Sequence, residues 1–229
     1  MKLSVIIPLA EGEQAWRDLL PDLAALPADS EVILALPQDA SPLDLPAIHS
    51  SLTIRQVREG SGRARQMNAA ARTAQGAQLW FLHADSRLHP ETIPALLRRL
   101  GEYPDWLLYA DLVFSADAPF LMKLNEMGVW FRSHALGMPF GDQGLCIRKK
   151  TFYELGGYPE DVAYGEDHVF VWRARQRGIR LRPMGARLTT SARKYCERGW
   201  LKTTHLHLCL TLRQAWPEWR RLMMSGDKA

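Results

Sequence analysis

A single carboxylate, Asp85, follows the mostly apolar run 79–83 and precedes a short polar stretch. This pattern is typical of a buried parallel strand that ends in a loop, and ligands of open α/β sheets bind at that end. Mg²⁺ is commonly held by one or two carboxylates together with substrate phosphates. Asp85 is therefore a candidate ligand for a divalent cation, although it would also suit a helix N-cap. His83 is either a second ligand or a partly buried side chain that orients a neighbour.

Two other segments carry cations that could meet a phosphate. Gly62 opens a segment rich in Ala and Arg, in which Arg63 lies beside the turn and Asn68 lies about one turn later. The N-terminal amides of a helix in this position could face an anion. Arg193 and Lys194 follow the last expected strand, where two cations could stabilise charge on a departing phosphate. The alternative at both places is a turn or loop whose cations are solvated.

Polar residues in the second half of the chain could act on an acceptor. Glu166 and Asp167 lie at the start of an expected helix, where one of them could remove a proton from an attacking hydroxyl group. Carboxylates also favour helix starts through the helix dipole alone. Asp142 and Gln143 lie between two glycines, which suits a loop pressed against a ligand, although Asp and Gly also favour plain hairpin turns.

Strands and helices alternate along the first hundred residues, which predicts βαβ units and a parallel sheet. Strands are expected at 3–9, 31–36, 53–57 and 79–83, helices at 13–26, 62–75 and 90–100, and a loop at 37–46. Later strands are expected at 107–114, 144–148 and 179–182, and later helices at 119–135 and 166–177. The tail after residue 200 is expected to be a helix, although Leu alternates there with His, Cys and Thr as in a strand.

The chain has 229 residues, a charged content of 24% and a net charge of +4. Its cations are spread along the sequence, which favours an anionic small molecule over nucleic acid as the ligand. Three cysteines without paired spacing indicate free thiols in a reducing compartment, and we expect neither a signal sequence nor a membrane span. We therefore expect a cytoplasmic protein with any membrane contact peripheral. His205, His207 and Cys209 do not have the spacing of a zinc site on a helix.

Five segments, taken in their order, resemble family-2 glycosyltransferases of the GT-A fold. They are GRARQMNAAA, LWFLHADSRLHP, FGDQGLCIRK, GGYPEDVAYGED and TSARKYCERG. The sequence looks most like the small bacterial transferases named for selenodomain proteins or arsenosugar biosynthesis. The resemblance implies a single α/β domain with a Rossmann-like, mixed and mostly parallel sheet flanked by helices. Residues 1–100 would form the nucleotide-binding half, 101–200 the acceptor-side half and 201–229 a helical tail.

The resemblance also implies roles for individual residues. HAD at 83–85 falls on the family's metal-binding motif, so Asp85 would hold Mg²⁺ or Mn²⁺ and the donor diphosphate. Asp167 would be the general base of an inverting displacement, and Glu166 beside it would contact acceptor or sugar. The acceptor-side loop would contain Asp142 and Gln143. The other donor-side residues would be Pro8, Glu11, Asp39, Arg63, Asn68, His83, Ala84, Arg193 and Lys194.

We therefore expect an inverting, metal-dependent enzyme that moves a sugar from a nucleoside diphosphate to a hydroxyl acceptor. One alternative is a catalytically degenerate nucleotide-sugar-binding protein, because the loop after the second strand has Leu36, Pro37 and Gln38 where the family usually carries acids. Another is a sugar-1-phosphate nucleotidyltransferase, which shares the α/β layout. Such an enzyme normally carries a longer Gly-rich signature near the first strand, and LAEGEQAW lacks one.

The tail carries three tryptophans among several cations, namely Trp200, Trp216 and Trp219 with Lys202, Arg213, Arg220 and Arg221. Aromatic rings and cations together suit a membrane interface that contains anionic lipid. The interpretation that we favour is a helix that packs on the catalytic core, covers the acceptor site and buries its tryptophans, because Pro217 interrupts a short apolar face.

Overall fold

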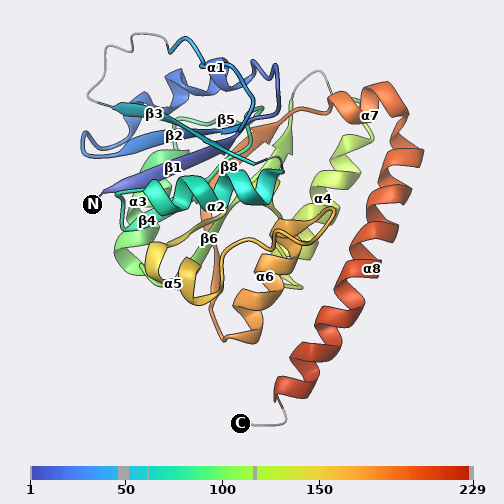
Figure 1. Cartoon of the computed structure of the whole chain (residues 1–229). Helices are drawn as coiled ribbons and strands as arrows, with labels where there is room; N and C mark the ends of the chain where they lie inside the picture. The colour runs from blue at the N-terminus through green and yellow to red at the C-terminus, as the bar shows by residue number, and fades with distance from the viewer. Residues whose placement is uncertain (1, 46–51, 61, 116–117, 227–229) are drawn as a thin grey trace.

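The computed structural model describes residues 2–45, 52–60, 62–115 and 118–226, so the expected loop 37–46 and tail 201–229 each end outside the described residues. Within these ranges an eight-stranded sheet has the order β3-β2-β1-β4-β7-β6-β8-β5 (Figure 1). The strands are β1 (Leu3–Pro8), β2 (Glu31–Pro37), β3 (Thr53–Glu59), β4 (Gln78–Phe81), β5 (Arg87–Leu88), β6 (Leu107–Phe114), β7 (Cys146–Arg148) and β8 (Leu181–Thr190).

The sheet has a parallel part and a mixed part. β3, β2, β1 and β4 are parallel neighbours, with Pro8 opposite Ala35 and Ile6 opposite Phe81. β7 is antiparallel to both β4 and β6, and β6 is parallel to β8. The loops after β1, β2 and β4 therefore leave the sheet at one edge, beside the place where the strand direction changes. The expected α/β fold with a mixed, mostly parallel sheet is confirmed.

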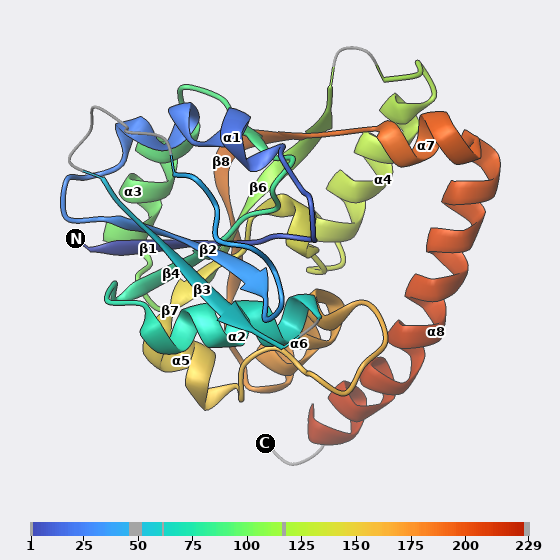
Figure 2. The same ribbon diagram turned by 45° about the horizontal axis from the view of Figure 1, so that its top comes forward.

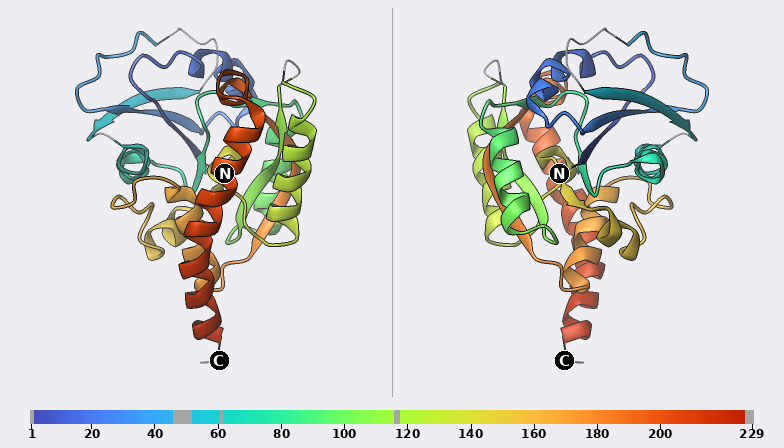
Figure 3. Two further views of the ribbon diagram at one scale, coloured as in Figure 1. Left: turned by 90° about the vertical axis from the view of Figure 1, so that its right-hand side faces the viewer. Right: turned by 90° about the vertical axis from the view of Figure 1, so that its left-hand side faces the viewer.

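Helices cover both faces of the sheet. The α-helices are α1 (Trp16–Leu19), α2 (Arg63–Thr73), α3 (Thr92–Glu102), α4 (Met122–His134), α5 (Lys149–Glu154), α6 (Glu166–Gln176), α7 (Arg193–Arg198) and α8 (Trp200–Gly226), and the 3₁₀ helices are η1 (Pro21–Ala25) and η2 (Gly141–Gln143). α1 and α3 contribute to the core on one face, and α2, α5 and α6 to the core on the other. Figure 3 shows α2 and α3 on opposite sides of the sheet.

The central strand β1 is apolar on both faces and contributes to both cores. Val5 and Ile7 pack in the cluster that contains Trp16 of α1 and Leu96 of α3, whereas Ile6 packs in the cluster on the α2 side. All five side chains are completely buried. Burying a side chain of this size stabilises the fold by about 1.5–3 kcal/mol, so the end of β1 is a rigid support for the loop that follows it.

The helix expected at 13–26 is divided in the structure. α1 ends at Leu19, and the 3₁₀ helix η1 begins at Pro21. Proline has no amide hydrogen for the helical ladder, and its ring crowds the preceding turn. The division places the side chain of Asp22 against β5, where it accepts two hydrogen bonds from Arg87.

The strand expected at 179–182 is much longer in the structure, where it forms β8. Alternate residues from 184 to 188 are buried, as in a strand with one face on the core. Pro183 and Gly185 conceal this period in the sequence, because both residues usually mark turns. The pairing of β8 with β6 is irregular between Tyr109 and Asp111, and this irregularity accommodates the segment of β8 that contains Pro183 and Gly185.

Smaller differences occur near the expected site. β4 ends at Phe81, so Leu82 and His83 belong to the loop that leaves the sheet. The basic segment after β8 was expected to be a loop and is the helix α7. β5 and α5 are two and six residues long, too short for a hydrophobic period to reveal them.

The tail forms the helix α8, as expected, and packs against α6 and α7. Figure 2 shows α8 running along one side of the molecule, away from β1, β2 and β3. The expectation that its tryptophans are buried is wrong, because Trp216 is 64% exposed and Trp219 is 45% exposed. Among the described residues, no helix has the length and apolar character needed to cross a membrane.

Candidate active site

Asp167 lies in the first turn of α6 and is buried. The backbone N–H of Gly141, in the turn before β7, donates a hydrogen bond of 2.5 Å to Asp167 Oδ2. Burial opposes the charge of Asp167, but Arg63, the Gly141 N–H, His83 and the His168 N–H favour it, so the pKa of Asp167 lies below its ordinary value. Asp167 is therefore an ionised carboxylate at neutral pH, as a proton acceptor must be.

Arg63, the first residue of α2, connects three elements of the site. Its Nε donates to Glu166 Oε1 on α6, and its Nη1 lies 3.2 Å from His83 Nε2 in the loop after β4. Burial lowers the pKa of Arg63, but Asp167 and Glu166 raise it above its ordinary value. Arg63 is thus a fixed cation that holds Glu166 beside Asp167.

Asp142 and Arg132 form a second charged group next to Asp167. Burial raises the pKa of Asp142; Arg132 opposes that effect, whereas Asp167 and Asp85 add to it. The Arg132 guanidinium lies 3.3 Å from the centroid of the Phe140 ring. Asp142 Oδ1 and Arg132 Nη1 are buried and have no hydrogen-bond partner among the described residues. Buried polar atoms are nearly always paired, so these two atoms are suited to contact a ligand.

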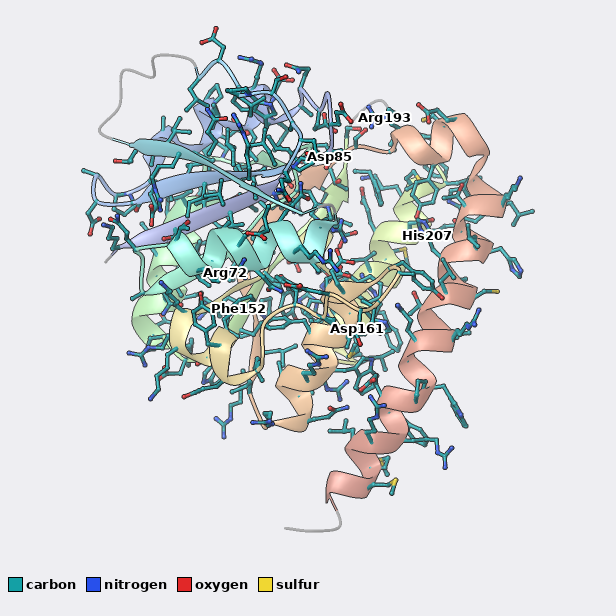
Figure 4. All side chains as sticks on the ribbon, viewed as in Figure 1. Arg72, Asp85, Phe152, Asp161, Arg193 and His207 are labelled. Carbon is teal, nitrogen blue, oxygen red and sulfur yellow. The ribbon has the colours of Figure 1, made fainter. Side chains whose placement is uncertain are left out.

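Asp85, whose charge also acts on Asp142, lies in the wall of a pocket of about 290 Å³. The pocket is also lined by Arg87, Ser191 and Arg193, and Figure 4 shows Asp85 and Arg193 close to each other beside α7. The backbone of Lys194 lies in α7, but its side chain is outside the described part of the structure. The pocket therefore combines three carboxylates, those of Glu13, Asp18 and Asp85, with the cations Arg87 and Arg193, a mixture that suits a diphosphate carrying a metal ion.

A divalent cation fits this pocket only with help from a ligand. Among the described residues, no group of three or more His, Cys, Asp or Glu side chains is arranged to hold a metal ion. Asp85 supplies one carboxylate, and Mg²⁺ or Mn²⁺ can complete its oxygen ligands with phosphate and water. The donor set therefore fits a metal that arrives with a diphosphate and does not fit a metal held by protein alone.

A second pocket, of about 320 Å³, lies at the carboxyl ends of β1 and β2. It is formed by the loops that follow Pro8 and Leu36, and the exposed Glu11 lies in its wall. Asp39 is exposed and precedes Ala40, which lines the pocket. Ala84 is buried in the loop between His83 and Asp85. Pro8, Glu11, Asp39 and Ala84, four of the residues expected on the donor side, thus lie at the ends of β1, β2 and β4 or in the loops that follow them.

Two of the expected site residues have their polar groups engaged by the protein. Asn68 Nδ2 donates to the Tyr158 carbonyl (2.9 Å) and to Glu160 Oε1 (2.8 Å), and Asn68 Oδ1 accepts from the Tyr158 N–H (2.9 Å). Gln143 Nε2 donates to the Ala110 carbonyl (3.0 Å), and Gln143 Oε1 accepts from the Phe140 N–H (3.2 Å). Both side chains therefore position loops of the site.

His168 is a residue that the sequence did not suggest. Trp172 Nε1, which can only donate, lies 3.0 Å from His168 Nε2, so the proton of His168 is on Nδ1 and is donated to Gln214 Oε1 (3.1 Å). Burial lowers the pKa of His168, which keeps the ring neutral. Gln214 also donates to the Tyr164 carbonyl (2.5 Å). α8 is thereby fastened to the first turn of α6, next to Asp167.

The sequence analysis also did not predict Arg132 and Gly141 as site residues, and the sequence indicates a role only for Gly141. This glycine precedes Asp142 in the segment FGDQGLCIRK, and a β-carbon there would lie 2.9 Å from Asp167 Oδ2 and 3.2 Å from His83 Nε2. Arg132 is one of many arginines and lies near the end of an unremarkable helix. Its role depends on a tertiary contact with Phe140.

The fold is that of an α/β protein with an open, mostly parallel sheet, and the carboxyl ends of its strands form the edge at which such sheets bind ligands. The chain belongs to glycosyl transferase family 2, whose family model matches residues 4–154. The matched region contains Asp85 and Asp142 and ends before Asp167. Curated protein sequences gave no match to this chain.

Solved glycosyltransferase structures share the fold. The mannosyltransferase PcManGT from Pyrobaculum calidifontis, in complex with GDP-Man and Mn²⁺, has a TM-score of 0.70 and 18% identity over 98% of this chain and 68% of its own. TarS 1–349 from S. aureus, in complex with UDP-GlcNAc, has a TM-score of 0.62 and 20% identity over 83% of this chain. The match spans only 58% of that TarS chain. Identities this low establish the common architecture, and the expected GT-A type of fold is confirmed.

Proposed function

We propose that this protein transfers a sugar from a nucleoside diphosphate to a hydroxyl acceptor with inversion at the anomeric carbon. The observation that carries the proposal is the buried, ionised Asp167, whose carboxylate accepts a hydrogen bond from the Gly141 N–H and whose charge is favoured by Arg63. A carboxylate in this state can accept the proton of an attacking hydroxyl group. Nucleotide sugars bound by PcManGT and TarS support the choice of donor.

The reaction is a single displacement. The acceptor oxygen forms a bond to the anomeric carbon while its proton passes to Asp167. The bond between the anomeric carbon and the phosphate oxygen breaks, and its electron pair leaves with the nucleoside diphosphate. We assign the orientation of the acceptor and the sugar to Asp142, whose Oδ1 has no hydrogen-bond partner among the described residues, and to Glu166, which Arg63 fixes.

The leaving diphosphate would occupy the pocket between Asp85 and Arg193. A divalent Mg²⁺ or Mn²⁺ bound there would neutralise charge on the phosphates, with Asp85 as its protein ligand. Arg193 would stabilise the same charge from α7, with Lys194 as the next residue of that helix. The nucleoside would lie in the second pocket, near Pro8, Glu11 and the loop that carries Asp39.

These assignments give each part of the chain a task. We assign nucleotide binding to residues 1–100, acceptor binding to 101–200 and a covering role to the tail 201–229. We also place the protein with the bacterial selenodomain-associated or arsenosugar-biosynthesis transferases, on the five motifs described above. A cytoplasmic site of action is part of this proposal.

A peripheral contact between α8 and an anionic membrane is a further part of the proposal. Leu212 is 69% exposed, and the exposed Trp216, Arg213 and Arg220 lie on the same helix. Apolar, aromatic and cationic side chains in this combination bind anionic lipid surfaces. Salt-sensitive co-sedimentation with anionic vesicles, weakened by Arg213→Glu with Arg220→Glu, would support the contact. No co-sedimentation at low salt would contradict it.

The experiment that tests sugar transfer is a screen of UDP-, GDP- and TDP-sugars with Mg²⁺ or Mn²⁺, read out as release of nucleoside diphosphate. Asp85→Ala should abolish the metal-dependent part of nucleotide affinity in calorimetry and leave the circular dichroism spectrum unchanged. Nucleotide binding that is the same in EDTA would contradict the role of Asp85. Tight donor binding without turnover would indicate a degenerate binding protein, and pyrophosphate release from a nucleoside triphosphate with a sugar-1-phosphate would indicate a nucleotidyltransferase.

A further inference from the structure

The first turn of α6 carries Glu166 and Asp167, and the residues of the turn itself hold it only weakly. The N–H groups of a first helical turn have no partner within the helix. A Ser, Thr, Asp or Asn side chain at the N-cap usually supplies one, but the N-cap of α6 is Gly165, which has no side chain. The position of the two acids therefore depends on groups outside the helix.

Gln214 of α8 binds this turn on both sides of the acidic pair. α8 packs beside α6 (Figure 1). Gln214 Nε2 donates to the Tyr164 carbonyl (2.5 Å), and Gln214 Oε1 accepts from His168 Nδ1 (3.1 Å). Tyr164 and His168 flank the segment 165–167, so a single side-chain amide group spans the turn that carries both acids.

The backbone at Gly165 leaves room for this contact. Its φ of +68° lies in the left-handed region that favours glycine. A β-carbon at Gly165 would collide with the side-chain amide of Gln214. The amide group of Gln214 therefore lies directly against the turn, in space that glycine leaves free.

The ring of His168 connects Gln214 with the surroundings of Asp167. The backbone N–H of His168 donates a hydrogen bond to the Asp167 carboxylate. The Phe140 ring packs on the His168 ring, with their centroids 4.9 Å apart. Phe140 directly precedes Gly141, whose N–H is another donor to the same carboxylate. A shift of the His168 ring would therefore disturb both of these backbone donors.

We propose that Gln214 is a positioning residue, which acts through His168 to hold Asp167 where the proton of the acceptor is taken up. The inference rests on the proposed role of Asp167 as the base and gives the tail helix a part in the reaction. With the Gln214 amide in place, the first turn of α6 is fixed and both N–H donors point at the carboxylate. Without it, the turn gains freedom, and a displaced carboxylate takes up the proton less efficiently.

The test compares Gln214→Met with Gln176→Met in the full-length protein. Methionine keeps the length of the side chain and removes its hydrogen bonds. Gln176 is the matched control, because it also joins α6 to α8, by donating to Glu218 Oε2 (2.9 Å), but is the last residue of α6. The readout is the rate of amide hydrogen exchange at Gly141 by NMR spectroscopy, and the amides of β1 report global unfolding.

Gln214→Met should speed exchange at Gly141 by about ten-fold, as loss of one ordinary hydrogen bond would, and Gln176→Met should leave it unchanged. Gln214→Asn, whose amide is too short to span the turn, is a milder second variant that should act in the same direction. Exchange at Gly141 that matches the wild type in both Gln214 variants would overturn the inference. An increase that Gln176→Met or the amides of β1 share equally would also overturn it, because it would show a general loss of stability.

The exchange measurement needs no sugar donor, which separates this inference from the proposed function. With a donor that the wild type turns over, Gln214→Met should lower kcat by about ten-fold and leave the KM for the donor unchanged. Selectively faster exchange at Gly141 in a protein that transfers no sugar would refute the proposed function and leave the positioning of Asp167 supported. Sugar transfer with an unchanged kcat in Gln214→Met would refute the positioning role alone.

Discussion

The backbone N–H of Gly141 lies 2.5 Å from Asp167 Oδ2, and the same glycine leaves the space in which that carboxylate and His83 meet. The first residue of η2 thereby fixes the carboxylate on α6. The contact joins two segments that are 26 residues apart. The Gly141 N–H fixes the position of the Asp167 carboxylate and also stabilises its negative charge.

Gly141→Ala tests the positional part of this contact. The new methyl group would lie 2.9 Å from Asp167 Oδ2, so the carboxylate must move. We expect kcat to fall by on the order of 10–100-fold, as displacement of a reacting group by about 1 Å does, with donor affinity unchanged. Gly128→Ala is the control, because a β-carbon at this helical position meets nothing within 4 Å. Equal activity of the two variants would show that the position of Asp167 is not set by this glycine.

Arg63→Gln tests the electrostatic part. Arg63 favours the ionised form of Asp167, so its loss raises the pKa of that carboxyl group. Because the base must be ionised, the acid limb of the pH profile of kcat/KM should move to higher pH. Arg65→Gln, a change in a more exposed pair with Glu160, should leave the limb in place. An acid limb that is the same in Arg63→Gln and the wild type would contradict the assignment.

The pKa of His168 is lowered by burial, and this predicts a pH dependence of stability. The unfolded chain binds a proton at this histidine below about pH 6.5, whereas the folded protein does not. The free energy of unfolding should therefore decrease as the pH falls from that value towards the folded pKa. Urea unfolding at several pH values measures it, with His168→Gln as the comparison. If both proteins lose stability equally between pH 7.5 and pH 5.5, another group is responsible.

The sequence revealed residues whose chemistry stands out at the ends of elements. Asp85 follows an apolar strand, and Glu166 and Asp167 open a helix, so their positions at the sheet edge could be predicted. The sequence also explains why the helix expected at 13–26 is divided at Pro21, because the effect of proline on a helix is local. In each case, neighbours in the chain supply the information.

Features that depend on distant contacts could not be predicted in this way. One hydrogen bond of the His168 ring joins it to Gln214, 46 residues further along the chain. Asn68 has a polar side chain that suits a ligand, yet in the structure it holds the backbone of Tyr158, 90 residues away. The exposure of Trp216 depends on which face of α8 packs on α6, and the alternating tail sequence does not specify that face.

The measurement that tests the central claim most directly is a comparison of Asp167→Asn with the wild type, using a donor that the wild type turns over. Asparagine keeps the size of the side chain and cannot accept the proton. We predict that kcat falls on the order of 10²–10⁴-fold, while the dissociation constant of the nucleotide sugar, measured by calorimetry, stays the same. Transfer at a rate near that of the wild type would contradict the account and make Glu166 the next residue to test.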